Sequence, residues 1–240
     1  MKTKNKLIII SSIVGALLIV FLCVYLIFIL PEKKKEKELL AQVEQYYATK
    51  LETYELENEQ VDDYEVDVAF VGDSLTDGYN LDAYFPDIVT SNRGIGGETT
   101  IGLEKRLKVS IYDLKPKVVV MLIGGNNLKT MFDNYEKIVK CIKENLPETE
   151  VVLLSLTAMG KDWKHKNEIA ALNNVKIKMI ADKYDCFYVD LFTPLYDLST
   201  NELYADYTVD GAHFTQKGYE VVTETIRPTI LLALEKYSKK

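Results

Sequence analysis

From residue 64 onward, short apolar runs rich in β-branched residues alternate with longer stretches of helical periodicity. The apolar runs are Val66–Val71, Ile88–Ser91, Val118–Ile123, Val151–Leu156 and Cys186–Val189. The helical stretches are Thr100–Leu114, Lys129–Asn145, Lys166–Tyr184 and Thr215–Tyr237. Strands that are apolar throughout and separated by helices indicate a parallel sheet buried on both faces. We therefore expect an α/β domain over residues 64–240, a three-layer α/β/α sandwich with a mainly parallel five-stranded sheet.

Residues 7–30 carry no charged side chain. As a helix this stretch would reach about 36 Å, which exceeds a bilayer hydrocarbon core of about 30 Å. A cleaved signal peptide is the main alternative, because residues 1–6 form a leader with three lysines. Cleavable apolar regions are about 7–15 residues long and end in a small-residue site, which residues 27–31 do not offer. The sequence therefore predicts an uncleaved transmembrane helix and a single-pass protein of the cell membrane.

Lysines flank the predicted span on both sides, so the positive-inside rule does not choose an orientation. We expect the large domain to lie outside the cell. The chain has 36 acidic and 29 basic residues, a formal charge of −7, and three of the basic residues precede the span. The rest of the chain is therefore more acidic still, which argues against nucleic acid or an anionic membrane surface as a partner.

Residues 31–63 form a charged segment between the predicted span and the α/β domain. Apolar side chains recur in it at three- and four-residue steps, including Leu40, Val43 and Tyr54. This spacing predicts a stalk helix with one apolar stripe. The stripe fits packing on the domain and equally fits self-association with a second copy. Beyond the span only Cys141 and Cys186 remain, and their apolar contexts favour core packing.

The stretch VAFVGDSLTDGYN, residues 68–80, begins as a buried strand and then changes abruptly to glycine, carboxylate and hydroxyl side chains. Open parallel sheets bind ligands beyond the carboxyl ends of their strands. Ser74 lies at such an end and is a candidate nucleophile, although a plain turn would explain the composition. Asp73 and Asp77 are expected to shape this turn.

A serine nucleophile needs a general base, and imidazole is the usual one. The chain has two histidines. His165 lies in a charged stretch typical of the surface. His213 lies before the last predicted helix, three residues after Asp210, which could orient its ring as in a catalytic triad. Thr215 is the expected N-cap of that helix.

Two further strand ends carry groups that could stabilise a negative oxygen. The loop SNRGIGGETT, residues 91–100, lacks the Rossmann glycine spacing, and the backbone N–H of Gly97 could donate to an oxyanion. After the third strand, the spacing favours a second oxyanion donor and a helix N-cap about equally for Asn126. Asn127 is expected to cap a helix.

These four blocks together resemble the SGNH/GDSL hydrolases over roughly Val66 to Leu234, in the family's order. The resemblance implies a flavodoxin-like SGNH hydrolase fold and assigns Ser74 as nucleophile, with Asp210 and His213 completing the triad. It also implies an oxyanion hole made by the backbone N–H groups of Ser74 and Gly97 and by the side chain of Asn126. Two departures are mild: Glu98 stands where aspartate is frequent, and Asn127 stands where the third block often has Asp.

The implied activity is that of a serine esterase acting on carboxylic esters through an acyl-Ser74 intermediate. With an anchor that holds an acidic domain at the cell surface, we expect O-acetyl or short acyl esters of cell-surface carbohydrate as substrates. An acyltransferase and a lysophospholipase or lipase are the alternatives, and a non-catalytic glycan-binding scaffold is a third. No cofactor is expected, and the sequence lacks the motifs of a metal centre. Core or rim packing is expected for Tyr79, Trp163, Tyr204 and Tyr207.

Overall fold

The computed structural model describes residues 21, 22 and 24–240. The predicted span over residues 7–30 therefore lies outside the described residues except for its last part. Across the described part of the chain, no helix is both long enough and apolar enough to cross a membrane. The membrane anchor stays a prediction from the sequence.

The chain divides into two compact units, residues 1–50 and residues 51–240. In the first unit, the π-helix η1 (Tyr25–Ile29) is followed by the long helix α2 (Leu30–Asn58), whose side chains up to residue 45 are exposed. The helix predicted for the stalk is thus present. Residues 51–58 of α2 belong to the second unit, where Tyr54 is buried.

The second unit is built on a five-stranded sheet in which every neighbouring pair is parallel, with the order β2-β1-β3-β4-β5. The strands are β1 (Val68–Gly72), β2 (Thr90–Gly94), β3 (Val118–Leu122), β4 (Glu150–Leu154) and β5 (Phe187–Val189). Val68 pairs with Thr90 on one side and with Val118 on the other. The predicted fold class is confirmed.

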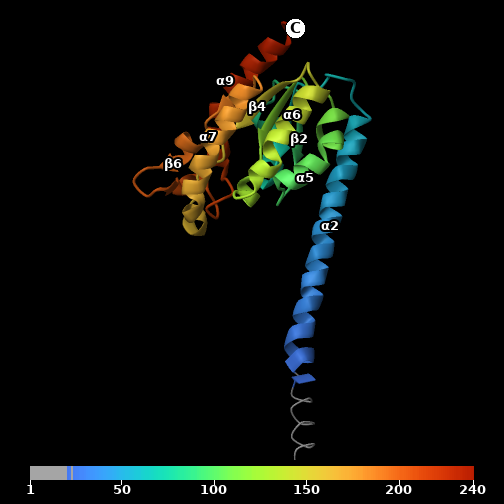
Figure 1. Ribbon diagram of the computed structural model, residues 1–240, viewed down its shortest axis with the longest axis vertical. Coiled ribbons are helices and arrows are strands. Elements are labelled where there is room, and N and C mark those ends of the chain that lie inside the picture. The colour runs from blue at the N-terminus through green and yellow to red at the C-terminus, as the bar shows by residue number, and fades with distance from the viewer. Residues whose placement is uncertain (1–20, 23) are drawn as a thin grey trace, which may run out of the picture. The chain divides into compact units, whose positions relative to one another are not determined.

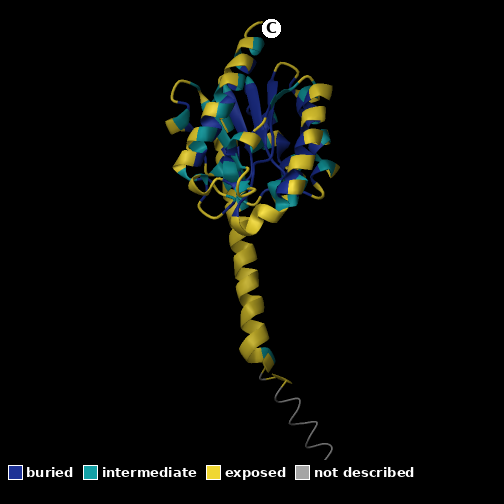
Figure 2. Cartoon of the chain, turned by 90° about the vertical axis from the view of Figure 1, so that its left-hand side faces the viewer, coloured by how far each residue is buried: buried dark blue, intermediate teal, exposed yellow. Residues whose placement is uncertain are grey.

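Apolar side chains from both faces of the sheet form two separate core clusters. On β1, Ala69 and Val71 enter one cluster, while Val68 and Phe70 enter the other. The first cluster is closed by α5 (Thr100–Lys105), α6 (Tyr135–Asn145) and α7 (Asn167–Lys183), and the second is closed mainly by α9 (Gln216–Tyr237). Figure 2 shows the strands buried between helices whose outer faces are exposed. This is the three-layer arrangement that the apolar strands predict.

The remaining elements are short. Most were not predicted, because they contain too few residues to show a periodicity, and those at residues 108–112 and 131–133 lie within stretches predicted as longer helices. The short elements are α3 (Ser74–Asp77), α4 (Leu81–Tyr84), η2 (Lys108–Tyr112), η3 (Gly125–Asn127), η4 (Met131–Asp133), η5 (Lys161–Lys166), α8 (Phe192–Leu195), β6 (Tyr196–Asp197), β7 (Glu202–Leu203) and η6 (Ala205–Tyr207).

Three predicted elements differ from the observed ones. The strand predicted at Ile88–Ser91 lies at residues 90–94, because the edge strand β2 buries the polar side chain of Arg93 rather than an apolar run. The helix predicted over residues 100–114 is interrupted at Arg106, whose guanidinium turns inward. The helix predicted from Lys129 begins at Tyr135, after the turn η4.

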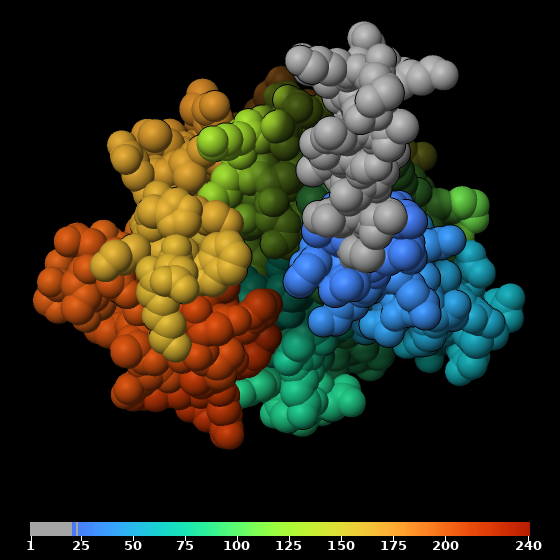
Figure 3. Space-filling view, turned by 90° about the horizontal axis from the view of Figure 1, so that it is seen from below, coloured from blue at the N-terminus to red at the C-terminus, as the bar shows by residue number. Residues whose placement is uncertain are grey.

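The carboxyl ends of the strands and the loops that follow them lie at one edge of the sheet. Figure 3 looks onto this side of the molecule, where the green segment near residue 125, the gold segment near residue 165 and the orange-red segment near residue 210 lie close together. The candidate site residues come from these loops.

Candidate active site

Ser74 is the first residue of α3, directly after β1 ends at Gly72. The side chain of Asp73 caps this short helix by accepting a hydrogen bond of 3.1 Å from the backbone N–H of Leu75. Asp73 itself is buried, and Ser74 is partly exposed. The sharp change from strand to helix therefore presents the serine hydroxyl at the sheet edge, as the sequence indicated for this turn.

The structure brings Ser74 together with His213 and Asp210, although they lie near opposite ends of the domain's sequence. Ser74 Oγ lies 3.0 Å from His213 Nε2, and His213 Nδ1 lies 2.7 Å from Asp210 Oδ2. Because an ionised carboxylate can only accept, the Nδ1 nitrogen carries the proton and Nε2 can accept the proton of the serine hydroxyl. This is the arrangement of a serine nucleophile with its general base and an orienting carboxylate.

Asp210 is held in its ionised form by the turn that carries it. Partial burial acts to raise its pKa, but hydrogen bonds from the His213 ring and from the backbone N–H groups of His213 and Ala212 outweigh it and hold the pKa well below its ordinary value. Asp210 Oδ1 accepts both backbone bonds, at 2.8 Å from His213 and 2.9 Å from Ala212. The same four-residue turn, from Asp210 to His213, thus fixes the carboxylate and the imidazole relative to each other.

The two remaining loops of the predicted oxyanion hole are joined by a hydrogen bond. Asn126 Nδ2 donates to the backbone carbonyl of Glu98 at 2.9 Å, next to Gly97. Gly97 is exposed with a φ of +76°, and Gly124 has a φ of +118°, both in the left-handed region that favours glycine. Asn126 lines the cavity beside Ser74, whereas Gly97 lies in the adjoining loop and is not among the lining residues.

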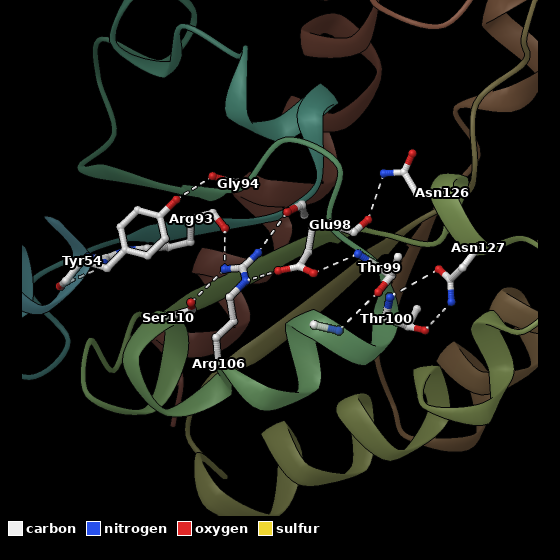
Figure 4. Close-up of polar contacts among 12 residues, drawn as sticks. Tyr54, Arg93, Gly94, Glu98, Thr99, Thr100, Arg106, Ser110, Asn126 and Asn127 are labelled. Carbon is white, nitrogen blue, oxygen red and sulfur yellow. Dashed lines mark hydrogen bonds and ion pairs between the residues drawn. The ribbon is translucent and has the colours of Figure 1, made fainter. Parts of the chain in front are cut away.

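A buried ion pair supports the loop that carries Gly97 (Figure 4). Arg106 Nε donates to Glu98 Oε2 at 2.8 Å, and both side chains are almost fully buried. The rest of the guanidinium donates to the carbonyl oxygens of Gly72 and Arg93 and to Ser110 Oγ. Arg106 therefore connects the loop to the strand end that precedes the nucleophile.

Asn127 does not cap the helix that follows it, so that prediction is wrong. Its side-chain oxygen accepts from the backbone N–H of Thr100 at 3.3 Å, and its nitrogen donates to Thr100 Oγ1 at 2.9 Å. Thr100 is the first residue of α5, so Asn127 caps a helix from a neighbouring loop. Thr215 does cap α9, by accepting from Gly218 N–H, as predicted.

Asp73 is a second carboxyl group at the site. Burial raises its pKa to about 6, opposed by the hydrogen bond from Leu75 and by the nearby His213. Its side chain lines the same cavity as Ser74 and His213. Removing this negative charge is therefore expected to favour the folded state.

The cavity beside Ser74 has a volume of about 160 Å³. Its wall is mainly apolar, with side chains of Leu75, Leu122, Leu156, Met159 and Trp163. A cavity of this size with apolar walls suits a small acyl group, because the aliphatic part of the substrate leaves water there.

Sequence reasoning did not single out Arg106 or Lys166. An arginine within a helical stretch indicates an exposed face, and no local signal marks Arg106 as buried. Lys166 lines the cavity through its position at the end of η5, an element too short to predict. Trp163 lines the cavity and is 40% exposed, whereas Tyr79 is buried in the core and His165 is exposed, as expected for both.

Comparison with known proteins agrees with this geometry. Residues 70–221 match the model of a family described as GDSL-like lipase/acylhydrolase. Platelet-activating factor acetylhydrolase IB subunit alpha2 from rat is 28% identical over 192 residues, covering 72% of this chain and 80% of the relative, and the human protein gives the same values.

Two solved structures share the fold. A GDSL-like lipase from Bacteroides thetaiotaomicron has a TM-score of 0.68 at 24% identity, covering 76% of this chain and 98% of the other. An acetylxylan esterase from Geobacillus stearothermophilus has a TM-score of 0.58 at 19% identity, covering 70% of this chain and 95% of the other.

Proposed function

Because the chain belongs to the GDSL-like lipase/acylhydrolase family and is a carboxylic ester hydrolase, we propose that it removes acetyl or other short acyl groups through an acyl intermediate on Ser74. The observation that carries the proposal is the 3.0 Å approach of Ser74 Oγ to His213 Nε2, with Asp210 on the other ring nitrogen.

The reaction has two steps. His213 takes the hydroxyl proton as Ser74 Oγ attacks the ester carbonyl carbon, and the carbonyl oxygen becomes negative. Asn126 and the backbone N–H groups of Ser74 and Gly97 donate to this oxygen, each contributing about 3 kcal/mol in the transition state. His213 then protonates the leaving alcohol, the carbon–oxygen bond breaks, and water activated by His213 releases the acid from Ser74.

Two observations support a short acyl group. The cavity of about 160 Å³ beside Ser74 is small and apolar. The names of the acetylhydrolase and of the acetylxylan esterase both contain the acetyl group. We expect kcat/KM to fall at least about tenfold between p-nitrophenyl acetate and the octanoate, because the longer chain does not fit the small cavity and displaces the ester carbonyl from Ser74.

We further propose that residues 7–30 tether the enzyme to the membrane with the catalytic unit outside the cell, facing carbohydrate esters of the surface. The support is the uncharged stretch of the sequence. Resistance of the full chain to alkaline extraction from membranes tests the tether. Cleavage of the catalytic unit by protease added to intact cells tests its orientation, and protection there with cleavage only after lysis contradicts it.

The test of the serine mechanism is Ser74→Ala in the full chain, assayed with p-nitrophenyl acetate. We expect a loss of at least about 10³-fold in kcat with an unchanged circular dichroism spectrum. Mass spectrometry of acid-quenched parent enzyme should find an acetyl group on Ser74. Ser199→Ala, at an exposed serine in the β6–β7 turn, is the control and should behave like the parent. Parent-like turnover by Ser74→Ala rejects the mechanism.

A further inference from the structure

A second hollow adjoins the cavity beside Ser74, which is called the acyl cavity here because the proposed function places the acyl group in it. This groove has a volume of about 710 Å³ and shares Gly125, Asn126 and Lys166 with the acyl cavity. A substrate that extends past Asn126 therefore enters the groove. Since the proposed function confines a short acyl group to the smaller cavity, the part of the ester in the groove is the alcohol.

The ionisable side chains that line this groove are Lys129, His165 and Lys166, and none is acidic. They come from two loops, one after β3 and one after β4. This local excess of basic groups contrasts with a chain whose formal charge is −7. The basic side chains of the groove would thus attract an anion at short range, although the net negative charge of the protein repels it at long range.

Among the residues that the structure describes, no carboxylate neutralises either lysine of the groove. In the described part of the chain neither Lys129 nor Lys166 takes part in an ion pair, and Lys166 Nζ lies 4.2 Å from the ring centre of Trp163. The neighbouring lysines are engaged elsewhere. Lys164 pairs with Glu202 at 2.7 Å, and Lys161 Nζ donates to the Val209 carbonyl at 2.7 Å. Both lysines line the groove, and within the described residues neither ammonium group has a carboxylate partner.

We propose that this groove binds a negatively charged group, a phosphate or a carboxylate, on the alcohol portion of the ester, with Lys129 and Lys166 as its cationic contacts. The inference rests on the proposed function, because it takes the acyl group to lie beside Ser74. It adds a substrate class: anionic esters are preferred over neutral ones of equal chemical reactivity.

The test compares p-nitrophenyl acetate with its analogue that bears a carboxylate on the ring, using the full-length enzyme. Each kcat/KM is divided by the alkaline hydrolysis rate of the same ester, so that the ratio reports recognition alone. We expect the parent to favour the anionic ester about tenfold at low salt. Raising the ionic strength from about 0.05 M to about 0.5 M should reduce that preference severalfold, because exposed charges are screened.

The decisive variant is Lys129→Gln/Lys166→Gln, in which the preference should fall to about one. Both rates are measured on the same variant, so a general loss of activity cancels in the ratio. The control is Lys140→Gln/Lys178→Gln, which removes the same charge from exposed ion pairs on α6 and α7 and should keep the parent's preference. Equal preference in the parent and the groove variant overturns the proposal, and so does an equal loss in both double variants.

A third arm distinguishes the two anions. Phenyl phosphate and benzoate are tested as competitive inhibitors at equal ionic strength, and the tighter one identifies the group that the groove prefers. Inhibition by neither overturns the proposal. Hydrolysis of the neutral ester by Ser74→Ala would instead overturn the proposed function, so the two failures are distinguishable.

Discussion

The phenol oxygen of Tyr54 lies 2.5 Å from the carbonyl oxygen of Gly94 and donates a hydrogen bond to it. Tyr54 belongs to the end of α2, and Gly94 is the last residue of β2, just before the loop that carries Gly97. Arg93 Nη1 in turn donates to the Tyr54 carbonyl at 3.1 Å, and its guanidinium lies 4.7 Å from the Tyr54 ring centre. Residues 51–58 therefore help to hold the edge of the sheet beside the active site (Figure 4).

Tyr54→Ala is expected to destabilise the protein by about 3–5 kcal/mol, because it removes a buried aromatic side chain and uncovers Arg93. Tyr54→Phe keeps the ring and should cost only about 1 kcal/mol for the lost hydrogen bond. Urea unfolding measures both. Leu56→Ala, at a side chain that is 53% exposed on the same helix, is the control and should change stability by less than about 0.5 kcal/mol. Equal effects of the two alanine variants would contradict the burial of Tyr54 within the second unit.

Asn126→Ala should lower kcat for a short acyl ester by about 10²–10³-fold with little change in KM, because a side-chain oxyanion donor acts mainly in the transition state. Asn127→Ala removes the neighbouring amide, which caps α5 through Thr100. We expect Asn127→Ala to lower the free energy of unfolding by about 1 kcal/mol. Its kcat should stay at least about tenfold above that of Asn126→Ala. Comparable kcat losses in the two variants would argue against Asn126 as a donor.

Arg106→Gln should cost about 3–5 kcal/mol in the free energy of unfolding, because it leaves the Glu98 carboxylate buried without its cation. The backbone carbonyl of Glu98 accepts the hydrogen bond from Asn126. Because the loss of the ion pair disturbs this loop, kcat should fall as well. Lys108→Gln breaks an exposed ion pair with Asp113 in the neighbouring turn and should cost less than about 1 kcal/mol. If thermal unfolding shows similar losses for both variants, the buried pair does not support the loop.

Asp73→Asn should stabilise the protein in a pH-dependent way. Burial raises the pKa of Asp73 to about 6 from an unfolded value near 3.8, so the folded state holds the proton more tightly. The carboxyl group is therefore not unfavourable below about pH 4. Its penalty grows as pH rises from about 4 to about 6 and then stays constant, at no more than about 3 kcal/mol. Asparagine caps a helix equally well, so the bond from Leu75 is kept.

Denaturant unfolding of the parent and of Asp73→Asn between pH 4 and pH 8 measures this difference. The two proteins should be equally stable near pH 4, and the variant should be the more stable at pH 7. Asp77→Asn, a change of the same kind at the other end of the short helix α3, is the control. A stability difference that does not change with pH would contradict a buried, titrating Asp73.

Much of the fold followed from the sequence because it depends on local patterns. Runs such as Val118–Ile123 are apolar throughout, and only a strand covered on both faces needs that pattern. The edge strand β2 was placed too early along the chain because Arg93 is buried there through specific partners. Short elements such as η5 were missed because a single turn has no periodicity.

The sequence by itself determined which chemical groups end the strands: a serine after β1, an asparagine after β3, and an aspartate and histidine before α9. Parallel strands bring their carboxyl ends to one edge, so the serine and the asparagine had to lie near each other. Only the tertiary structure decided the 3.0 Å contact between Ser74 and His213, the small cavity, and the groove with Lys129 and Lys166. Distances, volumes and the pairing of charges depend on side chains from distant segments, and no local pattern encodes them.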